Sequence, residues 1–148
     1  MTTANYRCSP WASDQTAVVE AWGADRRAAL QAGLDGVLAL LRGGDGSPAP
    51  KHGLVVPLRG EGDSLAALFD DLLDDLVEQL AVHGPMQVVA LDGVLKRDRE
   101  GLVAWGYLFP QEHPAPEAVF ERAGAAEAVE AVEAPEDIRL RVTLRRLA

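Results

Sequence analysis

The chain has 148 residues, the usual size of one domain, and we expect a single domain over residues 1–148. Acidic residues outnumber basic ones by 23 to 14, and the resulting net charge of -9 argues against direct binding of nucleic acid. The one cysteine, Cys8, excludes an intrachain disulfide and a cysteine-based zinc site. Residues 1–9 lack the apolar segment of a secretory signal, and no apolar run approaches the roughly 20 residues that cross a bilayer. We therefore expect a cytoplasmic protein that does not bind membranes.

The first part of the chain predicts a strand followed by a helix, after an irregular segment at residues 1–12. Residues 16–22 are apolar and rich in β-branched side chains, which is typical of a strand. Asp25 has the chemistry of an N-cap, and the apolar residues that follow at helical spacing predict a helix to about Leu41.

A second strand–helix pair follows a loop at residues 43–53 that is rich in glycine and proline. The strand at residues 54–59 contains Pro57, which lacks the N–H that a central strand needs, so we expect an edge strand or a bulge at this residue. Residues 64–82 have the most regular helical spacing of apolar side chains in the chain. Both pairs share the strand-then-helix order, although the sequence itself shows no internal repeat.

The second half predicts strands at residues 87–91 and 102–109, joined as a hairpin, and then a loop at residues 110–117. Residues 118–134 stay open between helix and strand, since alanine and glutamate favour a helix while their spacing fits neither period. Residues 138–145 alternate apolar with polar side chains, as in a half-buried strand. The element order predicts an α+β fold, a two-layer sandwich with two main helices packed on one face of a largely antiparallel sheet.

Two segments resemble the archease family. Residues 22–41, WGADRRAALQAGLDGVLALL, are similar to the family's aromatic-glycine strand exit and first helix. Residues 59–80, RGEGDSLAALFDDLLDDLVEQL, are similar to its Gly-Glu-Asp-Leu helix entry and leucine-rich second helix. The resemblance implies an accessory protein rather than an enzyme. Archeases act in tRNA splicing, where they promote guanylylation of the GTP-dependent RNA ligase that joins ends bearing a 3′-phosphate.

The resemblance also implies a site for a divalent metal, Ca²⁺ or Mn²⁺, held by an aspartate of an N-terminal His-Thr-Ala-Asp motif and one near the last strand. An ungapped match from Gly23 puts the first aspartate on Thr16, whereas a match from Tyr6 puts it on Asp14. The second falls on Arg145. One aspartate beside an arginine is a poor ligand set for a hard cation, so we expect a degenerate site. An ion pair between Asp14 and Arg145 is one way to fill it.

The helix at residues 64–82 carries an acidic face opposite its leucines, within one arc of the helix. Its members are Asp70, Asp71, Asp74, Asp75 and Glu78. The face indicates a docking surface for a basic partner, a metal-recruiting surface or an ordinary solvated surface. Like charges one turn apart destabilise a helix, so we see no reason in folding for them.

The last strand carries several arginines, which fit a small-anion or RNA contact, a solvated strand face, or an edge strand that charge protects from aggregation. They are Arg139, Arg141, Arg145 and Arg146. The sequence contains neither a Gly-x-Ser-x-Gly motif nor a phosphate-binding loop, so no such motif indicates an enzyme. We therefore expect an archease-like accessory protein of the 3′-phosphate RNA ligase. The alternative is a protein-interaction module on the same fold, with no metal and no ligase role.

Overall fold

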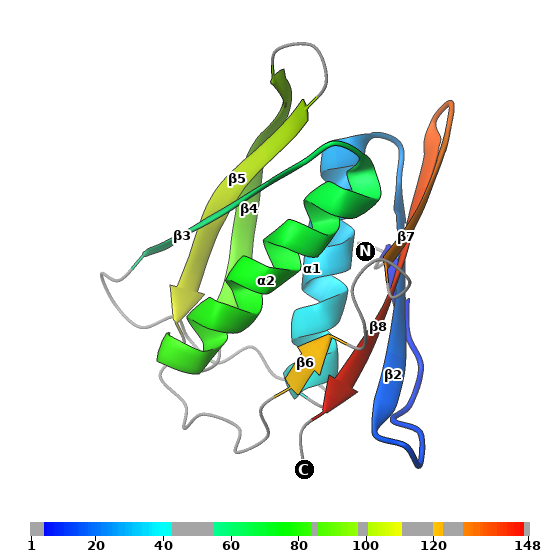
Figure 1. The fold of residues 1–148 in the computed structure, drawn as a ribbon, viewed down its shortest axis with the longest axis vertical. Helices are drawn as coiled ribbons and strands as arrows, with labels where there is room; N and C mark the ends of the chain where they lie inside the picture. Colours follow the sequence, from blue (N-terminus) through cyan, green and yellow to red (C-terminus); the bar gives the residue numbers. More distant parts are fainter. Residues whose placement is uncertain are drawn as a thin grey trace, which may run out of the picture.

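The structure is a computed structural model, and it describes residues 5–42, 55–83, 86–97, 101–110, 120–122 and 129–146. In chain order the elements are β1 (Tyr6–Cys8), β2 (Thr16–Gly23), α1 (Arg26–Arg42), β3 (Val56–Gly62), α2 (Leu65–His83), β4 (Met86–Arg97), β5 (Gly101–Pro110), β6 (Phe120–Arg122), β7 (Val129–Ala134) and β8 (Asp137–Arg146) (Figure 1). The predicted loop at 43–53 lies outside the described residues, as does the predicted loop at 110–117 except for Pro110, which ends β5.

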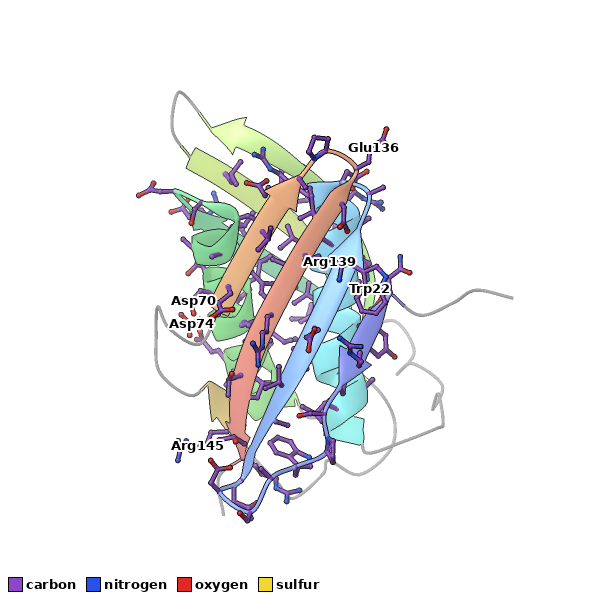
Figure 2. The ribbon with its side chains drawn as sticks, turned by 90° about the vertical axis from the view of Figure 1, so that its right-hand side faces the viewer. Trp22, Asp70, Asp74, Glu136, Arg139 and Arg145 are labelled. Carbon is purple, nitrogen blue, oxygen red and sulfur yellow. The ribbon has the colours of Figure 1, made fainter. Side chains whose placement is uncertain are left out.

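The strands form two separate antiparallel sheets. The larger has the order β1-β2-β8-β6, with β7 also paired to β8, and the smaller has the order β3-β5-β4. Figures 1 and 2 show both helices between the sheets. Helix α1 packs on β2 and β4, and α2 packs on β3, β5 and β7. The α+β class, with two helices packed on antiparallel sheet, is confirmed. The strands divide into two sheets because each strand–helix pair is completed by its own hairpin.

The two helices begin in the same way. Asp25 Oδ1 accepts a hydrogen bond from Ala28 N at 2.8 Å, and Ser64 Oγ accepts one from Ala67 N at 3.1 Å. Each side chain therefore binds a backbone donor of the first turn that has no partner inside the helix. The prediction of Asp25 as the N-cap is confirmed.

A glycine precedes each cap and lets the strand end run against the helix backbone. A Cβ atom on Gly23 would lie 2.5 Å from Ala29 N, and one on Gly62 would lie 2.5 Å from Leu68 N. Neither neighbour is the end of a flexible side chain, so a larger residue would push the helix away from its strand. The tight strand-to-helix step thus requires glycine in both pairs.

The correspondence extends through the whole fold. In one unit β2 leads into α1 and pairs with β8, whose hairpin partner is β7. In the other, β3 leads into α2 and pairs with β5, whose hairpin partner is β4. Each helix also contacts the outer hairpin strand of the opposite unit. The structure therefore contains two copies of a strand–helix–hairpin unit. The second copy, β3 to β5, is inserted in the chain between α1 and β7 of the first. The sequence alone does not reveal this repetition.

The core lies along the two helices. Helix α2 buries the apolar stripe that the spacing predicts, namely Leu65, Leu68, Phe69, Leu72, Leu73 and Leu76. Helix α1 approaches it closely, since a Cβ on Gly33 would lie 2.7 Å from Phe69 Cζ. No helix in the described part of the chain is long and apolar enough to span a membrane.

Two segments refine the expectations from sequence. Residues 6–8, inside the segment predicted to be irregular, form β1 and pair with β2. Within 118–134, the described parts at 120–122 and 129–134 are strands that pair with β8. The pairing partner outweighs the helical propensity of alanine and glutamate, because strand formation depends on neighbours more than on intrinsic preference.

Gly62→Ala is expected to lower the free energy of unfolding by about 1–3 kcal/mol, because the added methyl group meets backbone atoms of α2. Denaturant unfolding measures the change. Gly23→Ala should have a similar effect, whereas Ala24→Ser, at an exposed position, should leave stability unchanged. A Gly62→Ala protein as stable as the native chain would show that the strand and the helix are further apart.

Candidate functional site

The end of the larger sheet where β2 begins and β8 ends brings two predicted metal positions together. Thr16 is the register partner of Arg145, and the next pair, Ala17 with Leu144, is buried. Because successive side chains alternate between faces, Thr16 and Arg145 lie on the face away from the helices. Figure 2 shows Arg145 at this end of the sheet. Positions that were matched separately to the family's two aspartates are thus neighbours.

Asp14 lies in the turn before β2 and is bound to the start of that strand. Its Oδ1 accepts hydrogen bonds from Thr16 Oγ1 at 2.6 Å and from Thr16 N at 3.2 Å. These bonds hold the pKa of Asp14 below its ordinary value, and the charge of Arg145 adds only a minor lowering. The ion pairs between described side chains do not join Asp14 to Arg145. That predicted pair is wrong, because the carboxylate turns onto Thr16 instead.

A different arginine is bound to this turn. Arg146 N donates to Gln15 O at 2.8 Å, and its Nη2 and Nε donate to Gln15 Oε1 at 3.0 and 3.2 Å. The guanidinium carbon lies 4.7 Å from the centroid of the Trp11 ring, within the range of a cation–π interaction. We call these three residues, Trp11, Gln15 and Arg146, the arginine clamp.

The three positions that the resemblance assigns to the metal, Asp14, Thr16 and Arg145, do not fit a divalent metal ion. Hard cations take several oxygen ligands, usually with more than one carboxylate. Asp14 supplies one carboxylate, already bound by two donors of Thr16, and a guanidinium stands at the second position. In the described part of the chain, no group of three or more His, Cys, Asp or Glu side chains is placed to hold a metal.

The acidic face of α2 has a structural role that the sequence does not reveal. Asp71 Oδ2 accepts a hydrogen bond from Glu61 N at 2.8 Å, and Asp75 Oδ2 accepts one from Arg59 N at 3.0 Å. Strand β3 is an edge of the smaller sheet, as predicted, and alternate N–H groups of a strand point to the same side. The third residue in this alternation is Pro57, which has no N–H. The outward donors of β3 are therefore bound or absent, which prevents another strand from pairing there.

The opposite edge of the smaller sheet is fastened by the other helix. Leu91 N in β4 donates to Gln31 Oε1 at 2.8 Å, and Leu91 O accepts from Arg27 Nε at 2.7 Å. Leu91 lies between two irregularities in the pairing of β4 with β5. Side chains of α1 thus satisfy the backbone where the strand ladder is disturbed.

The remaining acidic residues of α2 are Asp70, Asp74 and Glu78. Figure 2 shows Asp70 and Asp74 on the side of α2 next to β7. Partial burial raises the pKa of Asp74, and the neighbouring charge of Asp71 raises it further. Docking of a basic partner on this face stays a prediction. Asp71 and Asp75 of the same face are hydrogen-bonded to the edge of β3.

The outer face of the larger sheet carries alternating charges rather than a basic surface. One row across the strands reads Arg7, Glu20, Arg141 and Glu130. Arg7 Nη2 lies 2.9 Å from Glu20 Oε2. Opposite charges across strands stabilise their pairing. This arrangement favours the solvated strand face over an anion or RNA contact.

The arginine clamp is not predicted by the sequence. Trp11 and Arg146 are far apart in the sequence, and neither forms a motif with its neighbours. A signal exists in the structure: Gln15 has a φ of 68°, a left-handed conformation that is rare for residues other than glycine, asparagine and aspartate. In this conformation both the backbone oxygen and the side-chain oxygen of Gln15 accept hydrogen bonds from Arg146.

Removing the carboxylates at the β3 edge should destabilise the protein. For Asp75→Ala we expect a loss of about 1–2 kcal/mol, because Arg59 N loses its acceptor. Asp71→Ala should act similarly, and the double variant should self-associate through the opened edge. Urea unfolding and light scattering measure both effects. Glu78→Ala, which removes the same charge from the same helix, is the control, and equal behaviour of all variants would refute edge closure.

The Asp14 carboxylate should titrate below the ordinary range for aspartate, and Thr16→Val should move its midpoint upward by removing one hydrogen bond. Because the folded pKa is lowered, the contribution of Asp14 to stability is present above its unfolded pKa and is lost as pH falls through the lowered value. An NMR titration of the side-chain carboxyl carbon measures both midpoints. Identical midpoints in the two proteins would contradict the Thr16 contact.

Comparison with known proteins gives a fold rather than a family. No family model matches the chain, and no curated protein matches it. The chain is similar to protein 1598 of Methanobacterium thermoautotrophicum, known from its solution structure, with a TM-score of 0.66 and 17% identity over 97% of this chain and 99% of that one. At this identity the likeness shows the fold alone. The chain has an archease-like α+β fold.

Proposed function

We propose that this chain is an accessory protein of a GTP-dependent RNA ligase that joins ends bearing a 3′-phosphate, and that it promotes guanylylation of the ligase. The observation that carries the proposal is the pairing of Thr16 with Arg145. These positions were assigned to the archease aspartates from opposite ends of the sequence, and their meeting supports the alignment on which the resemblance rests. The likeness of fold over nearly the whole chain adds to this support.

Such a protein would act by contact and would carry no chemistry of its own. Asp74 and Glu78 on α2 are exposed and offer complementary charge to a basic partner surface. With a net charge of -9, long-range attraction would favour a basic partner during association.

A second candidate is a protein-interaction module on the same fold, with neither metal nor ligase. The specific observation in its favour is Arg145, a cation where the archease resemblance places an aspartate. In this case the acidic side chains of α2 would still be the contact surface.

Guanylylation of the ligase from the same organism tests the proposal. We expect the chain to increase the rate at which radiolabelled GMP is transferred from GTP to the ligase. The double variant Asp74→Lys and Glu78→Lys should lose most of the effect, because it reverses two charges on the contact surface. Glu130→Lys reverses one charge on the outer face of the larger sheet and is the control. An unchanged rate with the native chain, together with capture of a different protein that depends on Asp74 and Glu78, would favour the interaction module.

A further inference from the structure

We propose that the guanidinium of Arg146 holds the turn before β2 in position, so that this end of the larger sheet functions without a divalent metal ion. Arg146 and its partners would hold the turn whether or not the protein acts on a ligase.

Arg146 contacts two residues of the turn segment, Gln15 and Trp11, in three ways. The backbone N–H of Arg146 binds Gln15 O, the guanidinium binds Gln15 Oε1 through two nitrogens, and the guanidinium carbon lies over the Trp11 ring. Trp11 in turn packs against the hydrophobic core. The turn is thereby fastened both to the last strand and to the interior of the protein.

The conformation of Gln15 requires such fastening. A left-handed backbone is unfavourable for glutamine and persists where surrounding contacts determine it. Gln15 N also donates to Ala12 O at 2.9 Å, which closes the turn on itself. The clamp therefore supplies the contacts that keep an otherwise unfavourable residue in place.

Arginine suits this position better than lysine would. Its planar group presents several donors in a fixed geometry and stacks on aromatic rings, whereas a lysine ammonium is a compact, strongly hydrated charge. Trp11, Gln15 and Arg146 are each partly buried. Partial removal from water strengthens both the hydrogen bonds and the cation–π contact.

The same geometry disfavours a metal ion beside the clamp. Arg145 shares the outer face of the sheet with Thr16, and the one carboxylate of the turn, Asp14, is bound by Thr16. A divalent cation would meet positive charge and would have to displace those hydrogen bonds. The arginine clamp orients residues 14–16. The backbone conformation of this segment therefore does not depend on Ca²⁺ or Mn²⁺.

Variants of two adjacent arginines separate the clamp from general effects of charge. Arg146→Ala should lower the Tm by several degrees, shift the Trp11 indole N–H resonance in a ¹H–¹⁵N spectrum, and increase hydrogen exchange at Gln15 N. Arg146→Lys should restore part of the Tm but not the indole shift, because lysine lacks the planar fork. Arg145→Ala removes the same charge one residue earlier and should change neither the indole resonance nor the exchange.

Metal titration provides the second arm, which uses the native chain and stays informative if Arg146→Ala does not fold. Millimolar Mn²⁺ or Ca²⁺ should leave the Tm of the native chain unchanged. The variant Thr16→Asp with Arg145→Asp places two carboxylates opposite each other and is a positive control in which Mn²⁺ should raise the Tm. A rise in the native chain that Asp14→Asn abolishes, or an indole resonance that Arg145→Ala moves as much as Arg146→Ala, would overturn the proposal. Either result would leave the guanylylation test unaffected.

Discussion

The burial of two helices between two sheets is the constraint on which the rest of the structure depends. Helix α2 buries one apolar stripe, helix α1 is buried along most of its length, and each must approach its neighbours closely. Gly33 meets this demand at the helix contact, where a Cβ would lie 2.7 Å from Phe69 Cζ. Gly23 and Gly62 meet it at the strand ends. Close packing of this kind leaves little freedom for added volume, so the positions of the sheets follow from where the helices can touch.

The same arrangement places helix side chains beside the edges of the smaller sheet. Asp71 and Asp75 bind the outward donors of β3, and Arg27 and Gln31 bind Leu91 in β4. Small sheets with open edges tend to pair with other chains, and native proteins cover such edges. Part of the acidic face of α2 therefore has a structural role, which is to bind the edge of β3. The repulsion between these carboxylates along the helix is offset by the hydrogen bonds of Asp71 and Asp75 to the edge strand. The charge that a partner could contact comes from the other acidic residues of α2.

The local elements were largely predictable from the sequence, and their assembly was not. Apolar spacing indicated both helices, and alternation indicated β8, because each pattern repeats within one segment. The prediction for Pro57 at an edge succeeded because it rests on a missing donor. The division into two sheets, the strands at 120–122 and 129–134, and the clamp escaped prediction because each depends on a partner distant in sequence. The Asp14–Arg145 pair was wrong for a local reason, since Thr16 competes for the same carboxylate.

At the end of the larger sheet, Arg145 stands where the archease resemblance implies a carboxylate, and the turn that carries Asp14 is held by Arg146. The most direct test is a crystal structure of the native chain from crystals grown with millimolar MnCl₂, with anomalous data collected above the manganese edge. We expect the Arg146 guanidinium on the Trp11 ring, Asp14 bound to Thr16, and no anomalous peak within coordinating distance of Asp14. A manganese ion bound by Asp14, with Arg146 turned away from Trp11, would contradict the metal-independent site.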